Sequence, residues 1–222
     1  MKKIFCMVCF ILLIQGCGFS QKPAWLINSR KELEAYRGNF LSGAESSVTE
    51  TNFKESVEDI KKSGNLDLLQ KAWLTRMALQ TVVFKEMEEG GYREVAAVKP
   101  FPENDNFYAF LKGNISAVDI KLLPEKYREF AGALLKGDAL KTGRAVASIK
   151  DEPLSRLIAA GIALRSNIES EAIIQTAVDT ASVNGWKTAL IAWLEHQAAF
   201  YEREGEAAKA AEIRRHIEVI ER

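Results

Sequence analysis

The stretch WKTALIAWLEHQAAFYEREGEAAKAAEIRRHIEVI, residues 186–220, indicates how this chain folds. Its apolar side chains recur every three or four positions, as they do on the buried face of an α-helix. One such face consists of Trp186, Leu190, Trp193, Gln197 and Phe200, and a second of Ala210, Ile213, Ile217 and Ile220. Only a short turn around Gly205 separates them, and helices joined so closely pack antiparallel. The stretch therefore predicts a helical hairpin.

Helix start and stop signals extend this pattern along the chain. Ser29 followed by Glu32 is typical of a capping box, Asn65 is placed to cap a helix from 66 to about 88, and Ser170 one from 171 to about 183. Glycines follow the expected helix ends, where left-handed caps occur: Gly64, Gly90 with Gly91, Gly137, Gly185 and Gly205. We expect an all-α domain over residues 28–222, with eight to ten helices stacked as antiparallel hairpins.

The longest stretch without a clear helical pattern covers residues 88–107. It contains a glycine pair and two prolines, and Val95 to Val98 is the only segment with strand-like character. Loops of this composition often carry binding residues. Tyr92, Phe101 and Phe107 are therefore a candidate binding lip on a concave helical surface; the alternative is that these aromatic side chains only fill a seam between helices.

The hairpin segment AWLEHQAAFYEREGEAAKAAEI, residues 192–213, is similar to a tetratricopeptide repeat. Ala192 and Trp193 lie where the repeat's first helix begins, and Ala210 lies where a small residue lets the second helix approach. A second, weaker similarity to the repeat covers residues 52–79, with Trp73 at the position of its tryptophan. Trp73 and Trp193 are 120 residues apart, which is no multiple of the repeat's period of about 34. The resemblance implies a degenerate, tetratricopeptide-like α-solenoid.

The first residues have the pattern of a secretory signal peptide. Lys2 and Lys3 precede eleven consecutive apolar residues, 4–14. As a helix this run reaches only about 16 Å, whereas the hydrocarbon core of a membrane is about 30 Å thick. A basic start, a short apolar run and a small residue at its end predict a segment that is removed, here residues 1–16.

The end of that segment, Ile14, Gln15, Gly16 and Cys17, resembles the lipobox of bacterial lipoproteins. Ile14, Gly16 and Cys17 match the family's pattern, whereas Gln15 departs from its usual small or β-branched residue. The alternative is an ordinary signal followed by an incidental cysteine. Cys6 and Cys9 lie inside the removed segment, so Cys17 is the one cysteine of the mature chain, and lipidation would leave no free thiol.

The lipoprotein resemblance implies a location. Cys17 would carry a diacylglycerol thioether and an N-acyl chain, which together hold a protein stably on a membrane. Gly18 replaces the aspartate that retains enterobacterial members of the family at the inner membrane, so the resemblance implies an outer-membrane anchor facing the periplasm. Residues 17–27 would form the lipidated N-terminus and a short tether.

Residues for catalysis or metal binding are few. His196 and His216 have no histidine or cysteine at metal-ligand spacing, so we expect no metal site and no cofactor beyond the covalent lipid. A cell-wall enzyme can use a single glutamate, for which Glu86, Glu88 and Glu89 are the candidates; the alternative is a solvated helix end. Without Lys2 and Lys3, 28 of the 30 basic side chains remain beside 30 acidic ones, and for so nearly balanced a body we expect no nucleic-acid partner.

These observations favour a non-catalytic, membrane-anchored periplasmic lipoprotein that acts as a helical scaffold or adaptor for envelope proteins. The alternatives are a cell-wall-acting enzyme with a single glutamate and a carrier of small hydrophobic ligands. A buried, desolvated glutamate in a cleft would favour the enzyme. An open groove would favour the adaptor, and a closed apolar cavity the carrier.

Overall fold

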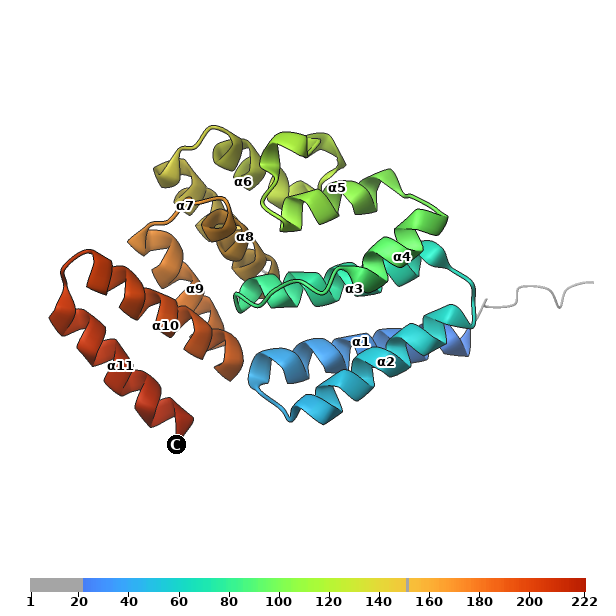
Figure 1. The fold of residues 1–222 in the computed structure, drawn as a ribbon, viewed down its shortest axis with the longest axis horizontal. Helices are drawn as coiled ribbons and strands as arrows, with labels where there is room; N and C mark the ends of the chain where they lie inside the picture. Colours follow the sequence, from blue (N-terminus) through green and yellow to red (C-terminus); the bar gives the residue numbers. More distant parts are fainter. Residues whose placement is uncertain (1–21, 151) are drawn as a thin grey trace, which may run out of the picture.

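The computed structural model describes residues 22–150 and 152–222, and over these residues the protein is all-helical (Figure 1). Its eleven α-helices are α1 (Ala24–Ser42), α2 (Ser46–Lys61), α3 (Leu66–Val82), α4 (Gly90–Val98), α5 (Pro102–Leu111), α6 (Glu125–Leu135), α7 (Ala139–Ser148), α8 (Pro153–Arg165), α9 (Glu171–Val183), α10 (Lys187–Arg203) and α11 (Ala207–Glu221). Two short 3₁₀ turns, η1 (Ile115–Ala117) and η2 (Ile120–Leu122), join α5 to α6. The expected all-α class is confirmed, with one helix more than the upper limit of ten.

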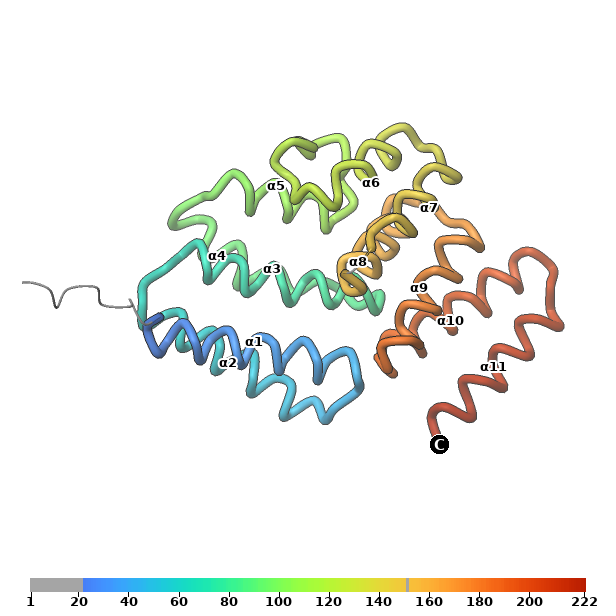
Figure 2. The backbone as a smooth tube through the Cα atoms, turned by 180° about the vertical axis from the view of Figure 1, so that it is seen from behind, coloured from blue at the N-terminus to red at the C-terminus, as the bar shows by residue number. Residues whose placement is uncertain are grey.

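Most helices pack against their neighbours in the chain. The pairs α1–α2, α6–α7, α9–α10 and α10–α11 lie side by side, and the last pair is the hairpin expected from residues 186–220 (Figure 1). Other contacts join parts of the chain that are distant in sequence: α3 and α5 pack against α8, and α1 packs against α10. The end of the first hairpin therefore lies beside α10 (Figure 2).

Helices α3 and α8 form the centre of the molecule. Most residues of both helices are buried, and α8 contains the run of apolar and small residues 157–163. Gly161 faces α3 so closely that a Cβ atom there would lie 2.7 Å from the carbonyl oxygen of Thr81. Only glycine permits this separation of the two backbones, so Gly161 sets how closely α8 crosses α3.

The cap assignments agree with the sequence in two of three cases. Asn65 accepts a hydrogen bond from the Leu68 amide at 3.0 Å, and Ser170 accepts one from the Ile173 amide at 3.3 Å. Gly64, Gly137, Gly185 and Gly205 have positive φ, as left-handed caps require. The Ser29 assignment was wrong: α1 begins at Ala24, and Ser29 lies inside it with its hydroxyl donating to the Leu26 carbonyl.

The interpretation of residues 88–107 was also wrong. Helix α3 ends at Val82 rather than near Glu88, and α4 and the first half of α5 occupy most of the expected loop. Val95–Val98 is the last part of α4, not a strand. The Gly90–Gly91 pair begins α4 instead of ending a helix. Gly91 packs against an indole, and a Cβ atom there would lie 2.2 Å from Cε2 of Trp73, so this contact requires glycine.

Helix α1 begins four residues before the expected start of the domain at residue 28, so residues 24–27 of the expected tether are helical. Residues 1–21 lie outside the described part of the chain. They include the expected signal peptide and the lipobox residues Ile14, Gln15, Gly16 and Cys17. Among the described helices, none is both long and apolar enough to cross a membrane.

Candidate functional site

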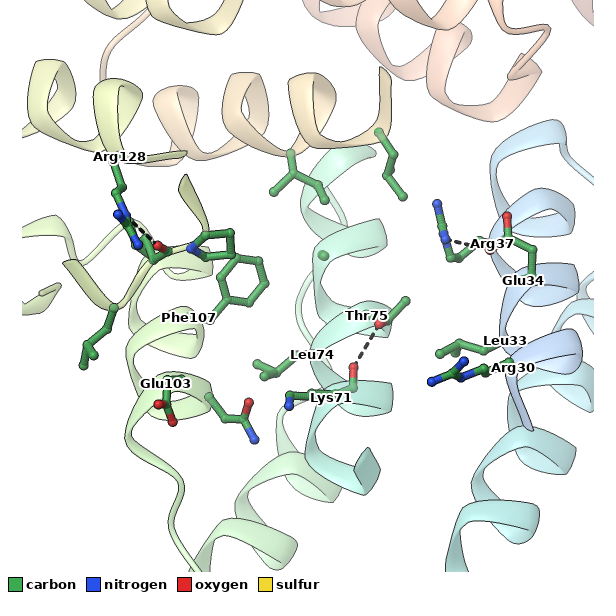
Figure 3. A pocket seen from close by; sticks show the side chains of 17 residues that line it. Arg30, Leu33, Glu34, Arg37, Lys71, Leu74, Thr75, Glu103, Phe107 and Arg128 are labelled. Carbon is green, nitrogen blue, oxygen red and sulfur yellow. Dashed lines mark hydrogen bonds and ion pairs between the residues drawn. The ribbon is translucent and has the colours of Figure 1, made fainter. Parts of the chain in front are cut away.

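A groove of about 850 Å³ runs over one face of α3 (Figure 3). Helix α1 forms one side, α5 forms the other, and α8 and the turn before α6 border one end. We call it the α3 groove. Its apolar lining comprises Leu33, Leu74, Ala78, Phe107, Leu122, Leu123, Pro124, Leu154 and Ile158. Its charged lining comprises Arg30, Glu34, Arg37, Lys71, Glu103 and Arg128.

The lining residues of α1 and α3 follow the spacing of a single helix face. On α1 they are Arg30, Leu33, Glu34 and Arg37, and on α3 they are Lys71, Leu74, Thr75 and Ala78. Both sets occupy positions i, i+3, i+4 and i+7, which span about 10.5 Å along a helix. The two helices run in the same direction (Figures 1 and 2). The groove therefore runs parallel to both, with Arg30 and Lys71 at one end and Arg37 and Ala78 at the other.

Buried polar side chains hold α5 at its distance from α3. The amide of Asn104, on α5, donates to Asp67 at 2.9 Å and to Gln70 at 3.1 Å, both on α3. Gln70 in turn donates to the Lys99 carbonyl at 2.7 Å. Burial alone would raise the pKa of Asp67, but hydrogen bonds from Lys71 and Asn104 hold it below its ordinary value. Asp67 is therefore ionised at neutral pH and keeps this side of the groove in place.

Some charged groups of the groove form ion pairs within the part of the protein that the structure describes, and others do not. Arg37 donates to Glu34 at 2.6 Å, and Lys71 donates to Asp67 at 2.7 Å. Among the described residues, neither Arg30 nor Glu103 forms an ion pair. The groove thus keeps one uncompensated cation on its α1 side and one uncompensated carboxylate on its α5 side.

Two arginines of the groove have nitrogen atoms that are not used in hydrogen bonds within the described part of the chain. Arg128 donates through Nε to the Leu123 carbonyl at 2.9 Å, which leaves its two terminal nitrogens for other partners. Arg37 has a buried Nε atom without a hydrogen-bond partner among the described residues. Arg37 and Arg128 lie on opposite sides of the end that α8 borders (Figure 3).

No protein-family model, curated protein or solved structure matches this chain.

The structure separates the three residues of the expected binding lip. Phe107 lines the α3 groove. Tyr92 is buried and donates from its hydroxyl to Asp105 at 2.6 Å, and burial raises its pKa. Phe101 is half-buried beside the ammonium of Lys99. Of the three aromatic residues, Phe107 alone contributes to the groove.

The three candidate glutamates lie outside the groove lining. Glu86 is exposed, and Glu88 accepts two hydrogen bonds of 2.9 Å from the buried Arg76. Glu89 accepts from Lys112 and from the Tyr108 hydroxyl, both at 2.7 Å. The hydrogen bond from Lys112 is the main reason that the pKa of Glu89 lies below its ordinary value. A general acid needs the opposite shift.

The two histidines differ in their surroundings. His216 is exposed on α11, as expected. His196 pairs with Glu169 at 2.6 Å, a partner from the loop before α9 that local spacing does not indicate. The described residues contain no group of three or more His, Cys, Asp or Glu side chains arranged to hold a metal ion.

The charged residues of the groove were not predicted from the sequence. A signal for two of them was present, because Arg30 and Arg37 flank Leu33 with the spacing of one helix face. Nothing in the local pattern placed Lys71 or Arg128 opposite that face.

Proposed function

We propose that this protein is a non-catalytic, lipid-anchored adaptor of the bacterial cell envelope. In this proposal Cys17 carries the lipid, the helical stack is tetratricopeptide-like, and the protein faces the periplasm from the outer membrane. The α3 groove receives a segment of another envelope protein. The groove is the observation that carries the proposal, because it joins an apolar floor to charged walls in one accessible surface.

The glutamate contacts support a non-catalytic reading. Glu88 and Glu89 are each held by cationic side chains, and neither lines the α3 groove. Glu103 and Glu34 do line it, but Glu34 is bound by Arg37 and both side chains are exposed. A glutamate acting as a general acid in a cell-wall enzyme would need an apolar setting that keeps its proton at neutral pH.

A carrier of small hydrophobic ligands is the second candidate. The groove volume of about 850 Å³ lies within the range of about 300–1,000 Å³ found for small-molecule sites. Nine of its lining residues are apolar, so a hydrophobic tail would find a favourable surface there.

Site-specific photocrosslinking tests the adaptor. A photoreactive amino acid replaces Thr75 in the groove, and in a matched control it replaces Glu212 on the exposed side of α11. Irradiation of whole cells followed by mass spectrometry should give a reproducible protein adduct from position 75 and none from position 212. Equal adduct patterns from both positions would count against the groove as the docking surface.

The anchor is tested separately with radiolabelled palmitate. The wild-type chain should incorporate the label and a Cys17→Ala variant should not. Incorporation into both proteins would end the case for a lipid on Cys17.

A further inference from the structure

The α3 groove is bordered by helices on three sides. Helices α1 and α5 stand on its two sides, α3 is its floor, and α8 borders one end (Figure 3). The lining faces of α1 and α3 are parallel over about two turns. A helix laid along them would meet apolar side chains below it, chiefly Leu33, Leu74 and Phe107.

The two sides of the groove differ in charge. The α1 side carries Arg30, which has no ion-pair partner among the described residues, and Arg37, seven residues later. Glu34 lies between them and accepts from Nη1 of Arg37, so the α1 side carries one net positive charge. Arg37 can still donate through Nη2 to a second carboxylate, as Arg76 does when it binds both Glu50 and Glu88. The α5 side carries Glu103. A bound helix with matching charges would therefore be acidic on one flank and basic on the other.

We propose that the groove binds an amphipathic α-helix of the partner protein, with an apolar face and two carboxylates seven residues apart. The apolar face would lie on Leu33, Leu74 and Phe107. The carboxylates would face Arg30 and Arg37, and a basic side chain on the opposite flank would face Glu103. This inference rests on the adaptor function proposed above and specifies the chemistry of the partner segment.

The distribution of cations favours a helix over a small amphiphile. Arg30, Arg37 and Arg128 lie at separate corners of the groove rather than around one point (Figure 3). A fatty acid has a single anionic head, which could meet only one of these corners. A helix with carboxylates at i and i+7 presents them about 10.5 Å apart, which is the spacing of Arg30 and Arg37 along α1.

An added strand would fit less well. Strand addition needs the free edge of a β-sheet, and the described residues contain no strand. The helical spacing of the groove's own walls instead suits ridges-into-grooves packing of another helix.

A charge-swap experiment tests the proposal on the full chain, reconstituted in lipid nanodiscs so that no detergent competes for the groove. The first probe is a fluorescent peptide of about 15 residues, long enough to form a helix, with a leucine face and glutamates seven residues apart on one flank. The second probe carries lysines in place of those glutamates. Fluorescence anisotropy should show that the glutamate peptide binds at least about fivefold more tightly, the upper end for one exposed ion pair.

Substitutions then assign the binding to the groove. Arg30→Glu should weaken the glutamate peptide and strengthen the lysine peptide, so that the preference reverses. Arg215→Glu, an equivalent change on the exposed side of α11, should leave both affinities unchanged. Thr75→Trp should abolish binding by filling the groove, with circular dichroism confirming that the variant is folded.

The remaining outcomes separate this inference from the adaptor function. Equal affinity for both peptides, or no effect of Arg30→Glu, would overturn the helical partner. The helical partner would also be overturned if neither peptide binds and the groove instead binds sodium dodecanoate saturably, with Thr75→Trp abolishing that binding. If the peptides behave as expected but position 75 gives no adduct in cells, the groove chemistry stands and the adaptor function fails. If position 75 crosslinks a protein but neither peptide binds, the adaptor stands and the helical partner fails.

Discussion

The ring of Phe84 meets the indole of Trp193 edge to face, with 4.8 Å between the ring centroids. Phe84 follows Val83, the C-cap of α3, and has a φ of 58°, a left-handed conformation that glycine usually adopts. The Lys85 amide donates to the Gln80 carbonyl at 2.9 Å and completes the helix cap. Phe84 can adopt this unfavourable backbone conformation because its ring packs against α10 and joins the end of α3 to that helix.

Two substitutions at Phe84 separate the backbone strain from the ring contact. Phe84→Ala loses the ring but keeps the unfavourable φ, whereas Phe84→Gly loses the ring and relieves the strain. We expect the glycine variant to be more stable than the alanine variant by about 1 kcal/mol, although both are less stable than wild type. Urea unfolding gives the three free energies. If the alanine variant were at least as stable as the glycine variant, the backbone at position 84 would not be strained.

The close contact of α3 with α8 predicts that replacing glycine by alanine at position 161 destabilises the protein. Gly161→Ala would place a Cβ atom 2.7 Å from the Thr81 carbonyl oxygen, and neither backbone can move without separating the helices. We expect a loss of about 1–3 kcal/mol in the free energy of unfolding. The measurement is the urea midpoint, compared with wild type at constant slope.

Gly132→Ala is the matched control for that substitution. Gly132 lies within α6, and apart from its own stretch of helix no atom lies within 4 Å of an added Cβ. Alanine there should stabilise the protein by about 0.5–1 kcal/mol, because glycine loses more backbone entropy on folding. Destabilisation by both substitutions to the same extent would mean that the α3–α8 approach is not special.

The parts of the fold that depend on local hydrogen bonds could be predicted from the sequence. Asn65 and Ser170 cap helices because their side chains reach an amide three residues ahead, and this needs no distant partner. The Gly90–Gly91 pair misled the prediction because its role depends on Trp73, eighteen residues earlier, and glycine against an indole looks like any other glycine in sequence.

The groove was harder to foresee for the same reason. Its walls come from α1, α3, α5 and α8, whose relative positions are set by tertiary contacts. Phe107 was identified from its aromatic character and lines the groove. Tyr92 had the same character but is buried against Asp105. Composition can suggest which side chains are available for binding, but only packing decides which of them stay accessible.

Buried Arg76 predicts a strong difference between arginine and lysine. Its side chain is 9% exposed, pairs with Glu50 at 2.8 Å and Glu88 at 2.9 Å, and lies over the ring of Phe53. Lysine cannot reach both carboxylates with one planar group. We expect Arg76→Lys to lower the free energy of unfolding by about 1–3 kcal/mol.

Arg93→Lys is the control for Arg76→Lys. The Arg93 side chain is 64% exposed and pairs with Glu89 on the surface. Its substitution should cost less than about 1 kcal/mol, as exposed ion pairs do. Chemical denaturation of both variants compares them directly, and equal losses would show that Arg76 contributes no more than a surface residue.

The pKa of Glu89 gives a prediction for acid that also bears on the enzyme alternative. Lys112 and Tyr108 lower the pKa of Glu89 in the folded protein. The ionised carboxylate therefore stabilises the fold above its unfolded pKa of about 4.3, and this stabilisation is lost as the pH falls through the folded pKa. The stability gap between wild type and Glu89→Gln should be under about 1 kcal/mol at pH 7, and it should shrink below about pH 4.

Thermal or urea unfolding between neutral and acidic pH measures the stability difference between wild type and Glu89→Gln. Glu86→Gln is the exposed control, and its stability should stay close to that of wild type at every pH. A gap for Glu89→Gln that grows on acidification would mean that folding raises the pKa of Glu89. Such a carboxyl group would hold its proton more firmly in the folded protein, as a general acid does, and the single-glutamate enzyme would regain support. A gap that narrows in acid identifies Glu89 as a structural carboxylate that ties α4 to α5.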